Sequence, residues 1–189
     1  MLNIFKRNTT AIAIVLAVVM LATRGHHAAS LTHLPDASWA IFFMLGFYLR
    51  NRVLLPVFLT LAALIDYVSI TKFGTSDFCV TAAYVFLVPA YSAMWLGGSW
   101  YASRHSHHMN SLPLFAAAAV VSTTLCEVIS SGSFYFLGGR FADTSLSGFA
   151  SRLAQYFPSD LASAVMYLGL AALIHVLIVS MQPSSVTNQ

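Results

Sequence analysis

The chain has 189 residues, of which 58% are hydrophobic and only 8% are charged. Soluble domains carry about 25% charged residues, so this composition excludes a soluble globular domain. The formal net charge of +3 is small and spread along the chain, which argues against nucleic-acid binding. The sequence therefore predicts one integral membrane domain over residues 1–189.

Six apolar runs follow one another along the chain, and each predicts a membrane-spanning helix. A spanning helix needs about 17–25 apolar residues; the last four runs meet this length, and the short second run needs tilt or shielding by its neighbours. The period-two pattern of a membrane β-barrel is absent, so helices remain. The predicted spans cover about residues 9–23, 37–50, 53–70, 79–101, 112–137 and 161–181.

The first run also has the basic start and apolar centre that are typical of a signal peptide. Lys6 and Arg7 supply that basic start. We nevertheless expect this run to be a retained helix.

The basic residues predict how the helices are oriented, because cytoplasmic loops carry an excess of Lys and Arg. We therefore expect a multi-pass protein of a bacterial inner membrane with both termini in the cytoplasm. In this topology the inner residues are Lys6, Arg7, Arg50, Arg52 and Arg104, and the outer ones are Arg24, Lys72, Arg140 and Arg152.

Several reactive side chains gather at the predicted outer end. His26 and His27 follow the first span, and Asp66 lies about one turn before the outer end of the third. Cys79 opens the fourth span, and Tyr84 lies just over one turn further in. An ionisable group in an apolar run is by default a functional-site hypothesis. The alternative for Asp66 is a structural hydrogen bond to a neighbouring helix.

Cys79 is unusual because the compartment outside a bacterial inner membrane is oxidising. A thiol at this place is a candidate soft ligand for a transition metal. The alternative is a small hydrophobe at a helix end. The other cysteine, Cys126, lies inside an apolar run. Two cysteines make no disulfide framework, and the sequence leaves a single pairing between them open.

Other polar groups point less clearly to a site. Glu127 and His175 lie at different depths in their spans, so each is expected to bond locally; the alternative for Glu127 is that it faces the outer pocket. The histidine-rich segment 104–108 has no carboxylate or cysteine near it in sequence. We interpret it as a polar cytoplasmic loop rather than a metal site.

Short motifs add a family resemblance. The first span has the small-xxx-small pattern of Ala13 and Ala17, which lets another helix approach closely. Six helices, this chain length and an outward polar cluster resemble the substrate-binding S component of an energy-coupling factor (ECF) transporter. More specifically, the chain resembles the BtuM family of cobalamin-specific S components over three segments: Leu-Pro-Asp-Ala-Ser-Trp-Ala at 34–40, Leu-Ile-Asp-Tyr at 64–67 and Phe-Cys-Val-Thr-Ala-Ala-Tyr at 78–84.

The resemblance implies uptake of cobalamin or a related corrinoid such as cobinamide. It implies that Cys79 is a ligand of the corrinoid cobalt and that Asp66, Tyr84 and His27, for which His26 competes, belong to the same binding region. A strong thiolate donor could also release cyanide from a cyanide-bearing corrinoid, so Cys79 is the candidate catalytic residue for cyanide removal.

The resemblance also implies partners, because no G-x-x-x-x-G-K-[ST] loop is present and any ATP hydrolysis must belong to other chains. The face of Ala13 and Ala17 would dock onto an ECF transmembrane subunit, which carries the ATPases. The sequence leaves open whether the protein uses such a module or works alone, which corrinoid it prefers, and whether it removes cyanide.

Two other functions remain as alternatives. A haem-binding membrane redox protein would use two histidines at matching depth on facing helices. His175 is the only histidine deep in a predicted span, so no such pair is apparent. The other alternative is a structural or assembly membrane protein without a ligand.

Overall fold

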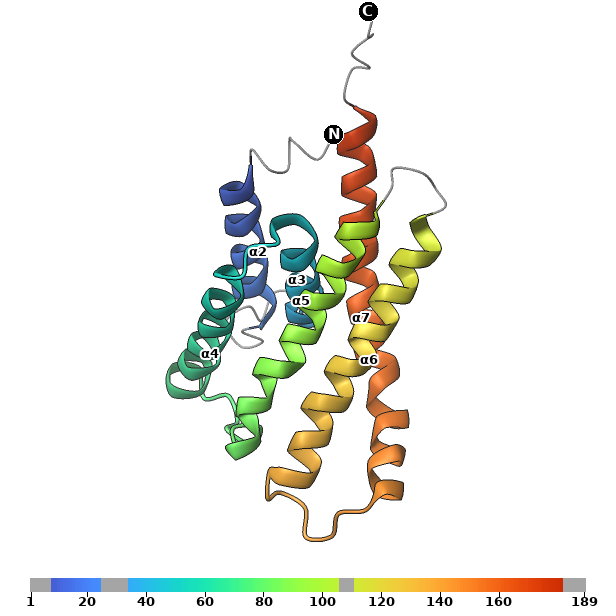
Figure 1. Ribbon diagram of the computed structural model, residues 1–189. Coiled ribbons are helices and arrows are strands. Elements are labelled where there is room, and N and C mark those ends of the chain that lie inside the picture. The colour runs from blue at the N-terminus through green and yellow to red at the C-terminus, as the bar shows by residue number, and fades with distance from the viewer. Residues whose placement is uncertain (1–7, 25–33, 106–110, 182–189) are drawn as a thin grey trace, which may run out of the picture.

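The computed structural model describes residues 8–24, 34–105 and 111–181, which form six α-helices and contain no strand. The all-α prediction is confirmed (Figure 1). A π-helical turn directly follows the second α-helix, and a 3-10 turn directly precedes the fourth. In chain order the elements are α2 (Thr9–Arg24), α3 (Ser38–Met44), the π-helix η1 (Leu45–Leu49), α4 (Leu54–Phe73), the 3-10 helix η2 (Ala82–Phe86), α5 (Leu87–Arg104), α6 (Leu112–Leu137) and α7 (Leu146–Ser180).

The helices run alternately up and down. Figure 1 shows the start of α2 and the end of α7 at the same end of the bundle, which we call the inner end. The turns between α4 and α5 and between α6 and α7 lie at the opposite, outer end. α3 sits in the middle, packed against α5 and in contact with α2 and α7.

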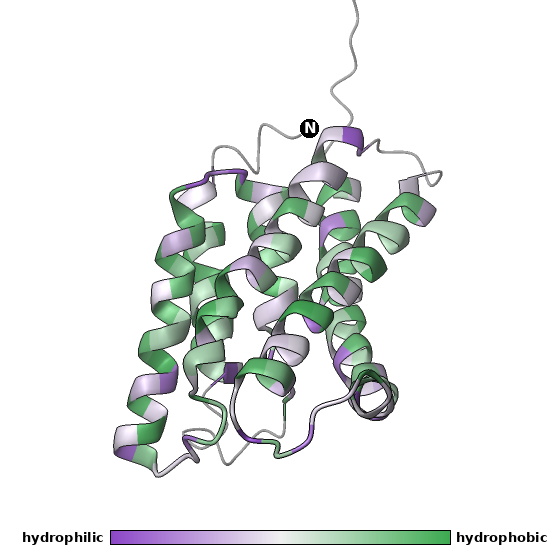
Figure 2. Cartoon of the chain, turned by 60° about the horizontal axis from the view of Figure 1, so that its bottom comes forward, coloured by the Kyte–Doolittle hydropathy of each residue, from purple (hydrophilic) through white to green (hydrophobic). Residues whose placement is uncertain are grey.

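Three helices, α4, α6 and α7, are long and apolar enough to cross a membrane. α2 and the combined α3–η1 helix are apolar but shorter, and α5 has 18 residues but does not join this group. Large apolar side chains such as Leu64, Val121 and Leu173 are exposed on the outer faces of the three long helices. Figure 2 shows that hydrophobic residues predominate along the helices, as expected where lipid replaces water.

The last helix differs from its prediction, because α7 begins at Leu146 rather than near residue 161. Pro158 lies inside it. A proline removes one helical hydrogen bond, but here the helix continues on both sides of it. With 35 residues, α7 is about 52 Å long, more than the roughly 30 Å of a bilayer core.

The start of the fourth predicted span also differs. Cys79 does not open a helix; it lies in a turn in which Val80 N donates to Asp77 O at 2.8 Å. The 3-10 helix η2 follows, and α5 begins only at Leu87. Pro89 lies in the first turn of α5, where its missing N–H has no intrahelical partner to lose.

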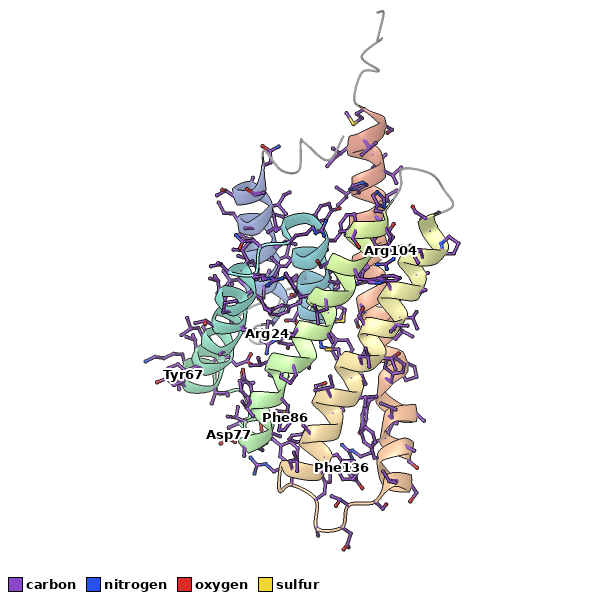
Figure 3. All side chains as sticks on the ribbon, viewed as in Figure 1. Arg24, Tyr67, Asp77, Phe86, Arg104 and Phe136 are labelled. Atoms are coloured by element: carbon purple, nitrogen blue, oxygen red, sulfur yellow. The ribbon has the colours of Figure 1, made fainter. Side chains whose placement is uncertain are left out.

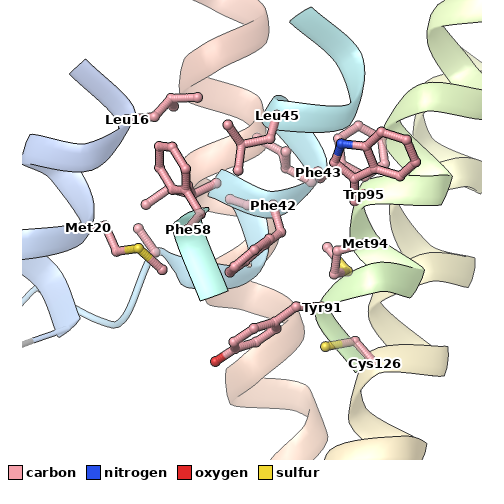
Figure 4. Packing of buried hydrophobic residues seen from close by; sticks show 14 of the residues in the cluster. Leu16, Met20, Phe42, Phe43, Leu45, Phe58, Tyr91, Met94, Trp95 and Cys126 are labelled. Carbon is pink, nitrogen blue, oxygen red and sulfur yellow. The ribbon is translucent and has the colours of Figure 1, made fainter. Parts of the chain in front are cut away.

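The core forms where α3 crosses α5. Phe42 stacks on Tyr91 with ring centroids 4.5 Å apart, and Met94 is fully buried beside them (Figure 4). The short second span is thus shielded by its neighbours, as its length required.

Two glycines let these helices touch at backbone distance. A Cβ on Gly46 would overlap the carbonyl oxygen of Trp95, and one on Gly98 would overlap that of Phe43. Because main-chain atoms cannot move out of the way as a flexible side chain can, the crossing depends on the absence of side chains here.

We expect Gly98→Ala to destabilise the bundle by about 1–3 kcal/mol, the usual cost of overpacking a close contact. Gly169→Ala is the matched control, since nothing lies within 4 Å of a Cβ at that position on α7. Thermal unfolding in detergent, followed by circular dichroism, measures both. Equal unfolding midpoints for the two variants would show that the close backbone contact at Gly98 does not stabilise the bundle.

Candidate functional site

A buried arginine organises the polar groups between the outer turns and the core. Arg24 ends α2, and its side chain is only 8% exposed. Its Nε and Nη2 donate to the two carboxylate oxygens of Asp66 at 2.7 and 2.8 Å. Its Nη1 donates to Ser38 Oγ at 2.9 Å and to the Tyr91 hydroxyl at 2.7 Å. Figure 3 shows Arg24 in the space between α4 and α5.

Asp66 is therefore a fully paired carboxylate. Besides the fork from Arg24, it accepts a hydrogen bond of 2.6 Å from the hydroxyl of Tyr84. Its side chain is 24% exposed. Of the two interpretations of Asp66, the hydrogen bond to neighbouring helices is observed, and a contact with a ligand stays a prediction.

The start of α3 joins the same cluster. Asp36 accepts from the backbone N and the hydroxyl of Ser38 at 2.9 and 2.6 Å, and it lies 3.5 Å from Arg24 Nη1. Tyr167 on α7 donates to the carbonyl of Pro35 at 2.7 Å. Residues 36–38, 66 and 84 thus meet around the Arg24–Asp66 pair, with Tyr84 joined through Asp66.

Sequence reasoning missed Arg24, which it used only as an outer positive charge for the orientation. A usable signal was present, because an arginine at the end of one apolar helix and a lone carboxylate inside another each need a partner in a membrane. The sequence gives no distance between the two, so their pairing could not be assigned from it.

The Cys79 thiol is exposed in its turn. The preceding residue holds that turn against the end of α6. Arg140 Nε donates to the Phe78 carbonyl at 3.1 Å, and its guanidinium lies 5.1 Å from the centre of the Phe78 ring. That ring meets Phe134 edge-on at 5.6 Å, and Phe134 in turn meets Phe141 at 5.9 Å. An aromatic wall therefore stands next to the segment that carries the thiol.

The predicted site residues are only partly brought together. Tyr84 and Asp66 are in contact, whereas Cys79 is connected to them through the chain and η2 rather than by a described hydrogen bond or ion pair. His26 and His27 lie outside the described residues. Within the described ranges no group of three or more His, Cys, Asp or Glu side chains could hold a metal ion.

Removing Arg24 should leave the partly buried Asp66 carboxylate without a counter-charge. Breaking a buried pair in this way costs about 3–5 kcal/mol. We expect Arg24→Ala to lower the unfolding free energy by this amount, measured by denaturant titration in detergent. Arg104→Ala, which removes an exposed arginine, is the control and should change it little. Similar losses in both variants would argue against a special role for the pair.

No protein-family model matches this chain, and no curated protein is detectably similar to it.

Proposed function

We propose that this protein is the membrane-embedded binding component of an uptake system for cobalamin or a related corrinoid such as cobinamide, and that the Cys79 thiolate binds the cobalt. The observation that carries this proposal is the exposed thiol in a turn at the outer end. That turn is fastened on one side to the aromatic wall and followed on the other by the Arg24–Asp66–Tyr84 cluster.

The chemistry of each group suits a corrinoid. Cobalt in a corrin has axial positions open to a donor, and a thiolate is a soft, strong ligand for a transition metal. The ring has an apolar body with amide side chains, which fits aromatic walls with a few polar anchors. Phe78 and Phe134 would line the apolar side, and Arg140 would offer a polar anchor. Asp66 and Tyr84 would act as positioning residues, because they fix η2 directly after the thiol segment.

With a cyanide-bearing corrinoid, the same site would exchange ligands. A cobalt–sulfur bond forms, and either the bond to cyanide or the bond to the lower base breaks. The electron pair of the broken bond leaves with its ligand, so this substitution leaves the oxidation state of the cobalt unchanged. Where the bond to cyanide is the one that breaks, Cys79 would be a catalytic residue for cyanide removal as well as a binding residue.

The membrane arrangement belongs to the same proposal. Six crossings would put both termini in the cytoplasm of a bacterial cell and the thiol outside. α4, α6 and α7 would meet lipid, and α2, α3–η1 and α5 would cross beside them.

An ECF transmembrane subunit would dock on α2. Ala13 is half-buried, while Ala17 packs partly against the core, so the accessible part of this face centres on Ala13. We expect Ala13→Leu to impair cellular corrinoid uptake and to leave corrinoid binding by the purified protein unchanged, because small residues permit close helix contact. Normal uptake by this variant would exclude docking through this face.

Thiolate binding should change the ligand field of the cobalt, so cyanocobalamin should shift its visible absorption spectrum when it binds. We expect Cys79→Ala to abolish this shift and to weaken binding, as measured by spectroscopy and calorimetry. Cys126→Ala is the matched control, because that thiol is fully buried in the core and should change neither. If Cys79→Ala kept the wild-type spectrum and affinity, Cys79 would not be a metal ligand and would be interpreted as a small hydrophobic residue.

Asp66→Ala should weaken corrinoid binding by about tenfold or more, which corresponds to about 1.4 kcal/mol. The reason is that Tyr84 and Arg24 lose the carboxylate that holds them, so η2 is no longer fixed. Asp143→Ala, in the exposed turn between α6 and α7, should bind like the wild type. Equal affinities for the two variants would leave Asp66 with a purely structural role.

A further inference from the structure

A pocket of about 260 Å³ lies at the inner end of the bundle, between α3–η1, α5, α6 and α7. Along α7 its wall runs from Leu168 to Ser180, a distance of about 18 Å at 1.5 Å per residue. The pocket is therefore long and narrow, and its long axis follows the helices. An apolar cavity of about 150 Å³ holds the six carbons of benzene, so this pocket has room for about ten carbons of a chain.

The pocket opens sideways, toward the face that lipid covers. Two of its lining residues, Leu112 at the start of α6 and Val176 on α7, are 45% and 58% exposed. A residue that lines a pocket and is also exposed marks its mouth, so the opening lies between α6 and α7. Both helices are long and apolar enough to cross a membrane. In a bilayer this mouth therefore faces acyl chains rather than water.

The polar side chains of the wall bond to one another. The Nδ1 atom of His105 is hydrogen-bonded to the Tyr101 hydroxyl at 2.9 Å, and that of His175 to the Tyr48 hydroxyl at 3.2 Å. The expectation that His175 bonds locally is therefore wrong, because Tyr48 lies on η1. Phe47 packs against the rings of Tyr101, His105 and His175, with centroids 5.3, 5.4 and 5.9 Å away. The wall thus presents mainly apolar atoms and aromatic rings to a guest.

Charge is distributed unevenly between the two ends of the bundle. The described inner end carries three exposed cations, Arg50, Arg52 and Arg104. Within the described ranges the only ion pairs are those of Arg24, so none of the three has a carboxylate partner there. The six acidic residues all lie in the outer turns or about 18 Å or more from the inner end along their helices. They are Asp36, Asp66, Asp77, Glu127, Asp143 and Asp160.

Two of these arginines adjoin the pocket. Arg104 ends α5 and directly precedes His105, and Arg50 follows Tyr48 by two residues; both neighbours line the pocket. The Arg104 guanidinium lies 4.4 Å from the centre of the Trp100 ring, and Trp100 is 43% exposed. Exposed Trp and Arg side chains anchor helices at the level of the lipid head groups. Figure 3 shows Arg104 at the inner end of α5. Cations therefore stand at head-group level beside a pocket that continues into the bilayer.

We propose that the inner pocket holds one acyl chain of an anionic phospholipid and that Arg50 and Arg104 bind its phosphate. Basic pockets between membrane helices on the cytoplasmic side bind anionic lipid head groups. The chain alone gains little, because the bilayer it leaves is as apolar as the pocket. The two guanidiniums therefore supply the preference for an anionic lipid, and the pocket limits the site to one molecule. The site does not depend on corrinoid binding at the outer end.

The test is native mass spectrometry of the full-length protein in detergent, which counts the lipid molecules that stay bound. The probes are phosphatidylglycerol, which is anionic, and phosphatidylcholine with the same chains, which is zwitterionic. We expect one bound phosphatidylglycerol per chain and binding of phosphatidylcholine that is weaker by about tenfold or more, or about 1.4 kcal/mol. Equal binding of the two lipids would overturn the proposal, and so would a protein that keeps neither.

Pocket-filling variants locate the site. Ala172 lines the pocket, so Ala172→Phe should weaken phosphatidylglycerol binding by about tenfold or more, or about 1.4 kcal/mol. Ala171→Leu, a smaller change to a second lining residue, should also weaken it and replaces the first variant if circular dichroism shows that this one does not fold. Ala162→Phe on the exposed face of the same helix is the matched control and should bind normally. Wild-type affinity in folded Ala172→Phe or Ala171→Leu would place the lipid elsewhere and refute the proposal.

Removing the two cations tests how the head group is recognised. The double variant Arg50→Gln with Arg104→Gln leaves the pocket intact, so it should bind phosphatidylglycerol and phosphatidylcholine about equally. Lys72→Gln with Arg152→Gln removes the same charge near the outer end and should keep the preference for the anionic lipid. A preference that survives in the inner double variant would exclude the two arginines as the phosphate site. Loss of the preference in the outer control would show that net charge alone causes it, which would also contradict the proposal.

Discussion

The outer half of this bundle depends on one buried ion pair. Arg24 and Asp66 share two short hydrogen bonds, and each charge would be costly to bury alone. The pair therefore holds α2 and α4 together, and through Ser38, Tyr84 and Tyr91 it also fixes α3, η2 and α5. The turn that carries the exposed thiol lies directly before η2, so its position follows from this pairing.

A different constraint governs the centre and the inner half. Gly46 and Gly98 bring α3–η1 and α5 to backbone contact, which aligns the aromatic residues of η1 with the end of α5. The two ends thus have different chemistry. The outer end combines an exposed thiol, cations and aromatic rings, whereas at the inner end aromatic rings and two imidazoles line an apolar pocket.

Much of the fold follows from local sequence. The run predicted at 112–137 coincides with α6, and those at 9–23 and 53–70 differ from α2 and α4 by no more than three residues at either end. The length of an apolar run is a local property of the sequence. In a membrane such a run must form a helix, because its backbone N–H and C=O groups have no water to hydrogen-bond. The starts of α5 and α7 could not be obtained in this way, since prolines at 89 and 158 are compatible with either a helix or its end.

The sequence by itself determined that this is an apolar all-α protein, and it singled out Asp66, Tyr84 and Cys79 as chemically unusual for their surroundings. Only the tertiary structure decided that Asp66 is neutralised by Arg24, that Cys79 lies in an exposed turn and that two distant histidines share one pocket. The physical reason is that hydropathy is summed over neighbours in the chain. Charge pairing and ring contacts depend instead on which helices cross, and glycines far apart in sequence set that crossing.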